Sequence, residues 1–185
     1  MDELLTRLDR VVPRFSDPAF LGNRGLANEV GIYFFCYNGA DEPVVDRFIE
    51  NLKAEQGHPF RPVHRDLYAI LLDICRERLV LDKIPQMEEQ KGKQSLLQSL
   101  QRLASPAAFA DKIGYKPHLP GDILLITGVG RVYPFMRAHR ILEDIQVLFE
   151  DIPIVLFYPG TFDGANPRLF GKLEDGNYYR AFNLL

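Results

Sequence analysis

The chain has 185 residues, 46% hydrophobic and 25% charged, which is enough apolar material for one packed core. Its net charge of −3 gives no general attraction to nucleic acid or to anionic membranes, so any such contact has to be local. Near the N-terminus charged and apolar residues alternate, and no signal peptide or membrane-length apolar run follows, which predicts a cytoplasmic protein without membrane contact.

Strands and helices are expected to alternate in the first part of the chain. Residues 30–37 (VGIYFFCY) form a continuous apolar run, which is typical of a strand covered on both faces. A helix follows, with Pro43 suited to its first position and Gly57 to its end. Residues 61–64 favour a short strand. The next helix has an apolar stripe made of Leu67, Ile70, Leu71, Ile74 and Cys75.

The middle of the chain is more polar. Residues 82–94 balance positive and negative charge and are expected to be a mobile connection or a frayed helix start within a single α/β domain spanning residues 1–185. Leucines at helical spacing resume at Leu96. Ser105 and Pro106 are suited to cap a short helix that Gly114 ends.

The last third of the chain completes the predicted sheet. We expect buried strands in residues 122–127 (DILLIT) and 152–160 (IPIVLFYPG), separated by a helix from Pro134 to Phe149. The buried stripe of this helix is expected to contain Phe135, Ala138, Leu142, Ile145 and Phe149. A C-terminal β-hairpin should join LFGKL to YYRAF through the turn EDGN. The alternation predicts an α/β fold with a mostly parallel sheet flanked by helices in three layers.

Residues 122–130 (DILLITGVG) have the outline of a phosphate-binding turn: a buried strand, two glycines and then a helix. A Walker loop continues with Gly-Lys-Ser/Thr, but the corresponding positions here are Tyr133 and Pro134. A dinucleotide fingerprint needs a third glycine, and that position is also Tyr133. No acid follows the apolar runs ILLI and IVLF. The sequence therefore predicts a nucleotide-binding-like fold without nucleotide motifs and with no cofactor.

An alternative remains open for this region. Glycines end each of three expected strands, at residues 38–39, 127–130 and 159–160, and parallel strands would bring them to one rim. These strand ends could serve a nucleotide-sensing or enzymatic domain. Thermal stabilisation by a nucleotide would favour that alternative.

Other catalytic and metal motifs are missing from the sequence. HRDL at residues 64–67 begins like a protein-kinase catalytic loop, but Leu71 stands where the metal-binding Asn would be. No serine lies in GxSxG, the histidines form no HxH or HxxxH pair, and Cys36 and Cys75 lack CxxC spacing. We therefore expect no catalytic residues and no metal site.

One charged segment stands out. Residues 131–140 (RVYPFMRAHR) contain three arginines, one histidine and no acid, whereas residues 141–151 contain four acids. The helix dipole favours acids near the N-terminus of a helix and bases near its C-terminus, which is the reverse of this order. We expect either a solvated charged face or a docking surface for an acidic partner, made of Arg131, Tyr133, Arg137 and Arg140. A further alternative is a DNA-contacting module using the three arginines of this segment.

Three segments in the last third of the chain carry a resemblance to a known family. ITGVGRVYPFMRAH, followed by VLFYPG and GKLEDGNYYRAF, resembles the BrxB family of bacteriophage-exclusion (BREX) defence systems. The resemblance covers about the last seventy residues. The layout of the N-terminal segment FLGNRGLANEVGIYFFCY also agrees with that family. It implies a small core component that acts beside an ATPase, a DNA methyltransferase and the alkaline-phosphatase-like PglZ protein, with no catalytic activity. The resulting expectation is a non-catalytic adaptor or assembly subunit. Its expected partners are other BREX proteins, above all the PglZ-like protein or the ATPase, and it meets nucleic acid only indirectly.

Overall fold

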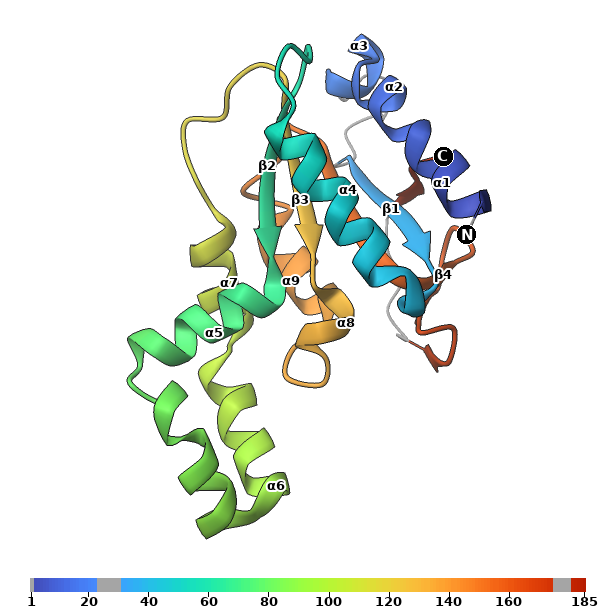
Figure 1. Cartoon of the computed structure of the whole chain (residues 1–185). Coiled ribbons are helices and arrows are strands. Elements are labelled where there is room, and N and C mark those ends of the chain that lie inside the picture. Colours follow the sequence, from blue (N-terminus) through green and yellow to red (C-terminus); the bar gives the residue numbers. More distant parts are fainter. Residues whose placement is uncertain (1, 23–30, 175–180) are drawn as a thin grey trace.

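The computed structural model describes residues 2–22, 31–174 and 181–185 and has a parallel sheet at its centre (Figure 1). The strands run in the order β2-β3-β4-β1-β7, and every neighbouring pair in this path is parallel. They are β1 (Ile32–Tyr37), β2 (Arg61–Asp66), β3 (Asp122–Thr127), β4 (Ile154–Phe162) and β7 (Phe182–Asn183). The predicted α/β fold with a mostly parallel sheet is confirmed.

Helices cover both faces of the sheet and create two hydrophobic cores. Within β1, Phe34 belongs to one core, whereas Tyr33 and Phe35 belong to the other, because successive side chains of a strand point to opposite faces. On the Phe34 side lie α5 (Leu67–Glu77), α6 (Ile84–Leu103), α7 (Pro106–Ile113), α8 (Val129–Val132) and α9 (Ala138–Ile145). On the other side lie α1 (Asp2–Asp9), α2 (Val11–Phe15), α3 (Pro18–Leu21) and α4 (Glu42–Ala54). Two short 3₁₀ helices, η1 (Gly39–Asp41) and η2 (Leu81–Lys83), precede α4 and α6.

Side-chain caps set the starts of several helices. Asn38 accepts a hydrogen bond from the Ala40 N–H before α4, and Asp66 accepts one from the Ala69 N–H at the start of α5. Ser105 caps α7, as the sequence predicts. These caps fix where the chain leaves the carboxyl ends of β1 and β2.

The predicted helix from Pro134 to Phe149 is present only over Ala138–Ile145, although Ala138, Leu142, Ile145 and Phe149 of its predicted stripe are buried. The chain instead forms the short helix α8, a turn over residues 133–137, and then α9 from Ala138. A proline disfavours helical backbone in the residue before it, so α8 ends at Val132 with Tyr133 extended at φ −67° and ψ 136°, and Arg137 is also extended, at φ −105° and ψ 137°, directly before α9. In consequence Met136 is buried, and Phe135 of the predicted stripe is only half-buried.

Residues 82–94, expected as a mobile connection or a frayed helix start, are largely helical. Helix α6 begins at Ile84, and its backbone is non-helical only at Gly92, where φ is 75°. The break divides α6 into two halves that lie side by side and project from the sheet (Figure 1). We call this projection the α6 arm.

The C-terminal hairpin is present, but other segments form it. Strand β4 turns back into β5 (Pro167–Leu169), and β5 pairs antiparallel with β6 (Leu173–Glu174). Phe182, the last residue of the predicted partner YYRAF, begins β7, which pairs with β1, whereas residues 175–180 lie outside the described residues. The Leu184 N–H donates to the Phe34 carbonyl at 3.0 Å, so this segment covers the edge of β1.

Candidate functional site

The carboxyl ends of β1, β2, β3 and β4 meet at one edge of the sheet, which is where open α/β sheets bind ligands. The chain leaves β1 for α4 on one face and leaves β3 for α8 on the other, so a crevice is expected between them. The glycine-bearing strand ends at residues 38–39, 127–130 and 159–160 lie along this rim, as parallel strands require. Asp66 and Thr127 face each other in the β2–β3 register.

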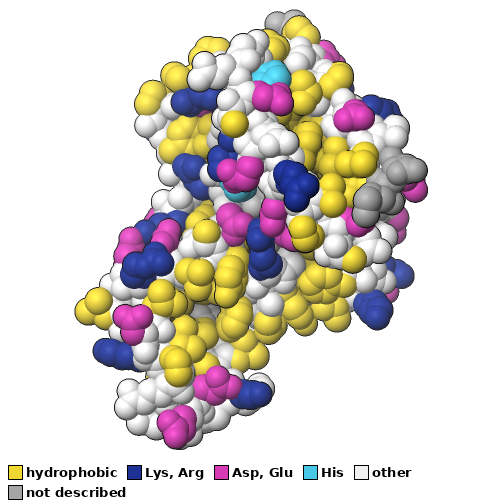
Figure 2. Space-filling view, in the orientation of Figure 1, with side chains coloured by type: hydrophobic (Ala, Val, Ile, Leu, Met, Phe, Trp, Pro, Cys, Tyr) yellow, Lys and Arg dark blue, Asp and Glu magenta, His cyan; other side chains and the backbone are white. Residues whose placement is uncertain are grey.

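Arg131, in α8, lies among three carboxylates at this edge. Its Nη1 donates to Asp46 at 3.0 Å, and its Nη2 donates to Asp66 at 2.7 Å and to Asp46 at 3.1 Å. Glu42 Oε1 lies 3.6 Å from the same Nη2. Burial lowers the pKa of Arg131. The negative charges of Asp66, Asp46 and Glu42 outweigh this effect and raise the pKa of Arg131 above its usual value. The chain therefore neutralises this arginine itself, and charged side chains gather on this part of the surface (Figure 2).

Asp66 connects this cluster to β2 and β3. Its Oδ1 caps α5, while its Oδ2 accepts hydrogen bonds from Arg131 and, at 3.4 Å, from the Thr127 hydroxyl. His64 Nε2 lies 2.7 Å from Thr127 Oγ1, and burial lowers the pKa of His64. Thr127 is only 2% exposed, so its hydroxyl has little access to a substrate. These hydrogen bonds connect β2, β3, α5 and α8 through buried or half-buried side chains.

Glu42 forms the buried side of the cluster. The Tyr37 hydroxyl donates to Glu42 Oε2 at 2.7 Å, whereas Oε1 is buried without a hydrogen bond. Burial raises the pKa of Glu42 above its usual value, and the Tyr37 hydrogen bond and the Arg131 charge reduce this rise. Burial, followed by the Glu42 carboxylate, also raises the pKa of Tyr37. An anionic ligand would meet carboxylates here, which opposes phosphate binding.

Phe170, in the turn between β5 and β6, lies against the glycines of the strand ends and is itself 43% exposed. A Cβ atom added to Gly130 would lie 2.9 Å from Phe170 Cε1, and one added to Gly39 would lie 3.2 Å from Phe170 Cδ1. The Phe170 N–H donates to the Pro159 carbonyl at 2.7 Å, which anchors the turn. Phe170 has φ 56°, a left-handed value that costs free energy in a bulky residue. The small residues of this rim therefore accommodate an aromatic ring of the same chain.

A cationic groove lies on another surface, around the turn that precedes α9. Its volume is about 400 Å³, and no carboxylate of the described residues lines it. The Arg137 guanidinium lies 5.4 Å from the centre of the Tyr133 ring. Arg140 is exposed, and within the described ranges no carboxylate lies at ion-pair distance from it. The lining residues are Gln101, Tyr133, Pro134, Phe135, Met136, Arg137, His139 and Arg140. We call this surface the cationic groove.

An apolar groove adjoins the cationic one between α5 and the α6 arm, and Phe135 lines both. Its volume is about 430 Å³. Hydrophobic side chains cover much of the arm and the surface beside it (Figure 2). The lining residues are Tyr68, Leu71, Leu72, Cys75, Ile84, Glu88, Lys93, Leu96, Leu97, Leu100 and Phe135. We call this surface the leucine groove.

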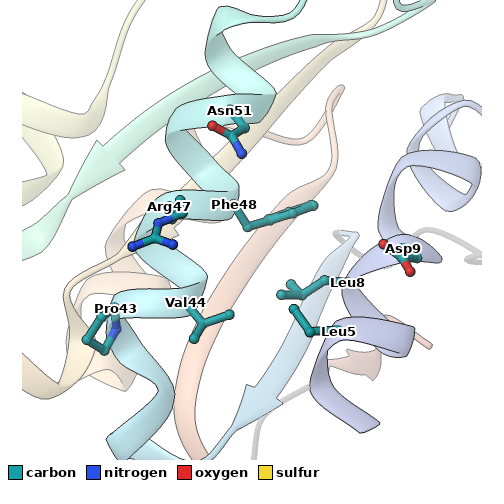
Figure 3. Close-up of a pocket in the computed structure, with 8 residues that line it drawn as sticks. All are labelled: Leu5, Leu8, Asp9, Pro43, Val44, Arg47, Phe48 and Asn51. Carbon is teal, nitrogen blue, oxygen red and sulfur yellow. The ribbon is translucent and has the colours of Figure 1, made fainter. Parts of the chain in front are cut away.

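A separate pocket lies between α1 and α4, with a volume of about 370 Å³ (Figure 3). Leu5 and Leu8 of α1 point toward Val44 and Phe48 of α4. Nothing in the arrangement selects an occupant for this pocket, but it offers a matched control for experiments on the leucine groove.

The structure brings together three of the four residues predicted for docking. Tyr133, Arg137 and Arg140 line the cationic groove, whereas Arg131 is held among carboxylates at the edge of the sheet. Sequence analysis did not identify Phe170 or the carboxylates around Arg131. The sequence does contain a sign of Asp66, because this acid ends the predicted strand near residues 61–64. That strand is short and polar, and an acid was expected only after the apolar strands.

Two further classes of feature are absent from residues 2–22, 31–174 and 181–185. No helix in these ranges combines the length and apolar character needed to cross a membrane. The same ranges contain no cluster of three or more histidine, cysteine, aspartate or glutamate side chains arranged to hold a metal ion. The three carboxylates near Arg131 are occupied by ion pairs and hydrogen bonds within the chain.

The fold and its surfaces define a class: a three-layer α/β protein whose usual ligand edge carries an internal ion-pair cluster around Arg131 and whose grooves lie on its helices. The chain belongs to the BrxB family, since the family model described as BREX protein BrxB matches residues 63–184. A Bacillus cereus (strain H3081.97) BREX protein BrxB is 37% identical, covering 100% of this chain and 99% of that protein. An Escherichia coli O9:H4 (strain HS) BREX protein BrxB is 30% identical, covering 97% of this chain and 90% of that protein.

The predicted resemblance to the BrxB family is thus confirmed, and membership supports a role in BREX phage defence. No solved structure matched the chain.

Proposed function

We propose that this protein is a non-catalytic adaptor or assembly subunit of a BREX complex in the cytoplasm. The cationic groove is its docking surface, and Tyr133, Arg137 and Arg140 recognise an acidic patch on another BREX protein. Based on the family resemblance, the PglZ-like protein and the ATPase are the first partners to test. Arg131 is left out of the docking surface because three carboxylates of the chain already engage it.

The main support is Arg140, an exposed cation in the first turn of α9 without a carboxylate partner in the described part of the chain. A cation near a helix N-terminus opposes the helix dipole and costs about 0.3 to 1 kcal/mol when exposed. Folding alone therefore gives no reason for a cation here, whereas an acidic partner does. The ion-pair cluster that occupies part of the carboxyl edge supports the non-catalytic part of the proposal.

The test reverses two charges. The Arg137→Glu, Arg140→Glu double variant should keep the wild-type melting temperature or exceed it slightly, because acids suit the start of a helix. It should nevertheless lose the partner in a pull-down at moderate salt and lose phage protection, because charge reversal adds repulsion to the lost attraction. An Arg10→Glu, Lys172→Glu variant makes the same charge change at exposed positions elsewhere and should retain the partner.

Wild-type partner recovery by the double variant would contradict the proposal, and so would unfolding of that variant. The DNA-contacting alternative makes a different prediction. If the arginines of the cationic groove contact phosphates, the wild-type protein should shift duplex DNA in a gel, with a steep dependence on salt that the double variant loses. We expect no such shift.

A further inference from the structure

The α6 arm leaves apolar side chains partly uncovered beside α5. The chain breaks its helix at Gly92 and turns back, so both halves of α6 contribute side chains to the leucine groove. Leu71 and Leu100 are buried, whereas Leu72 and Leu97 of the same groove are only half-buried. A protein that covers this surface gains the apolar area that is still exposed.

Two charges of opposite sign line this groove, and they indicate which protein covers it. Glu88 is half-buried and Lys93 is exposed. They form no ion pair with each other, and in the described part of the chain neither has another ion-pair partner. An acidic partner would meet Glu88 and a basic partner would meet Lys93, so neither class is complementary to the groove. A second copy of the chain is complementary, because it brings a lysine for Glu88 and a glutamate for Lys93.

The positions of Glu88 and Lys93 determine how two copies pair. Glu88 lies about one helical turn before Gly92, and Lys93 directly follows Gly92, so both lie near the tip of the arm. A contact between Glu88 of one copy and Lys93 of the other therefore requires the two tips to lie at the same level. The arms then run side by side in the same direction about a two-fold axis, and this contact occurs twice.

The α6 arm is well placed for such a contact. It projects from the sheet, so a second arm can lie beside it without meeting the central strands (Figure 1). Each arm contributes two half-helices, and four helices of this kind pack as a bundle around a core of apolar side chains. In this arrangement the leucine grooves of the two copies cover each other.

We infer that the leucine groove is the interface of a homodimer, in which the α6 arms of two copies lie side by side and Glu88 of each copy meets Lys93 of the other. This inference goes beyond the proposed docking function and does not depend on it, because it needs only the chain itself. A groove of about 430 Å³ gives a small interface, so the dimer is reversible and its fraction depends on protein concentration.

The first experiment measures the mass of the purified full chain by sedimentation equilibrium. The wild-type protein should be a dimer at about 100 μM and a monomer at about 0.1 μM. The dissociation constant of the Leu72→Gln, Leu97→Gln dimer should be at least about tenfold higher, because apolar contacts are lost in both copies. Leu72→Ala, Leu97→Ala provides a milder pair that keeps the test valid if the glutamines disturb folding. Leu5→Gln, in the α1–α4 pocket, should leave the dimer unchanged.

The second experiment uses the symmetry of the pairing. Glu88→Lys places two lysines in each groove and Lys93→Glu places two glutamates, so each variant alone should dimerise about tenfold more weakly than the wild type. A mixture of the two variants should associate as a heterodimer with about the wild-type affinity, because every contact then joins a lysine to a glutamate. The double variant Glu88→Lys, Lys93→Glu should also dimerise like the wild type. An interface elsewhere on the chain does not give this pattern.

A wild-type chain that stays monomeric at about 100 μM would overturn the inference. A dimer that neither the leucine variants nor the charge variants weaken would also overturn it, because the interface would then lie elsewhere. If the chain is monomeric and Leu72→Gln, Leu97→Gln loses another BREX protein in a pull-down, the groove belongs to that protein and the homodimer is wrong. The docking proposal is tested separately through Arg137 and Arg140, so either proposal can fail while the other stands.

Discussion

Arg131 and Arg140 lie nine residues apart in the chain but in opposite environments. Arg131 donates hydrogen bonds to Asp46 and Asp66, and the Phe170 ring lies against Gly130 of its helix, so side chains of the chain itself occupy part of the carboxyl edge of the sheet. Arg140 is exposed, with no carboxylate at ion-pair distance in the described ranges, beside two grooves that stay open. The contrast suggests that the usual ligand edge now stabilises the fold and that the helical surface is left for recognition.

The largest effect is expected from removing the arginine that the chain itself neutralises. Arg131→Met leaves Glu42 and Asp66, whose side chains are 16% and 21% exposed, near Asp46 without their cation. Breaking a buried pair costs about 3 to 5 kcal/mol, and partial exposure of Arg131 lowers the expected loss to about 2 kcal/mol. Urea unfolding measures this loss, which added salt should partly restore by screening the remaining carboxylates.

Arg140→Met is the matched control for that variant. Both variants replace an arginine with methionine. In Arg140→Met no carboxylate of the described residues loses a partner, so the free energy of unfolding should change by less than about 0.5 kcal/mol. Equal losses in the two variants would contradict the contrast between the two surfaces.

The fold was predictable where the signal is local. Strands β1, β3 and β4 lie in continuous apolar runs, and a run of this kind needs little information from the rest of the chain. The exceptions have identifiable causes. The predicted helix begins at Ala138 instead of Pro134, because Arg137 is extended, and apolar periodicity carries no information on where the helical backbone starts. The hairpin prediction assigned YYRAF to its neighbour in sequence, whereas β1, far away in the chain, offers it a free edge.

The site was less predictable because its contacts span long separations. Arg131 lies 85 residues from Asp46 and 65 from Asp66, and no local pattern connects them. Phe170 follows β5 in a turn, where the sequence offers no sign that its ring reaches Gly39 and Gly130. The arginines of residues 131–140 were recognised by composition, but only the structure separates Arg131 from Arg137 and Arg140.

A double-variant cycle tests how closely the Phe170 ring packs against the strand ends. Gly130→Ala alone should destabilise the protein, because its new Cβ would meet the Phe170 ring and Pro159 Cγ at 2.9 and 3.0 Å. In the Phe170→Ala background the ring contact is absent, and alanine is the better helix former. The two changes should therefore be coupled by about 1 kcal/mol in the free energy of unfolding. Additive effects would mean that Phe170 is not seated between the strand ends.

The same variants report on nucleotide binding at this edge. Millimolar ATP or GTP should leave the melting temperature of the wild-type protein and of Phe170→Ala unchanged. In both proteins, carboxylates stand where a nucleotide-binding site would have groups that bind phosphate. Saturation at 100 times the dissociation constant would add about 2.7 kcal/mol and raise the melting temperature by several degrees. A rise in the Phe170→Ala variant alone would show that the ring blocks a competent site.

The smallest expected effect concerns the charge on Glu42, which the chain buries next to Arg131. Because burial raises the pKa of Glu42 in the folded state, its contribution to stability is fully present below the unfolded value near 4.5 and is lost as pH rises through the folded pKa. Glu42→Gln removes this titration but can still accept the Tyr37 hydrogen bond. The variant should therefore match the wild type near pH 4 and exceed it at pH 7 by less than about 1 kcal/mol.

Chemical unfolding across pH 4 to 8 measures the difference between Glu42→Gln and the wild type, and the titration of His64 cancels because both proteins contain it. Glu50→Gln provides a control of opposite sign. The Lys53 hydrogen bond lowers the pKa of the exposed Glu50, so that carboxylate stabilises the fold above pH 4.5 and its loss should slightly reduce stability at neutral pH. A Glu42→Gln variant that is less stable than the wild type at pH 7 would mean that Arg131 more than offsets the burial of Glu42. The carboxyl edge would then be held together by that ion pair, and the interpretation of Glu42 as a charge retained at a cost would be wrong.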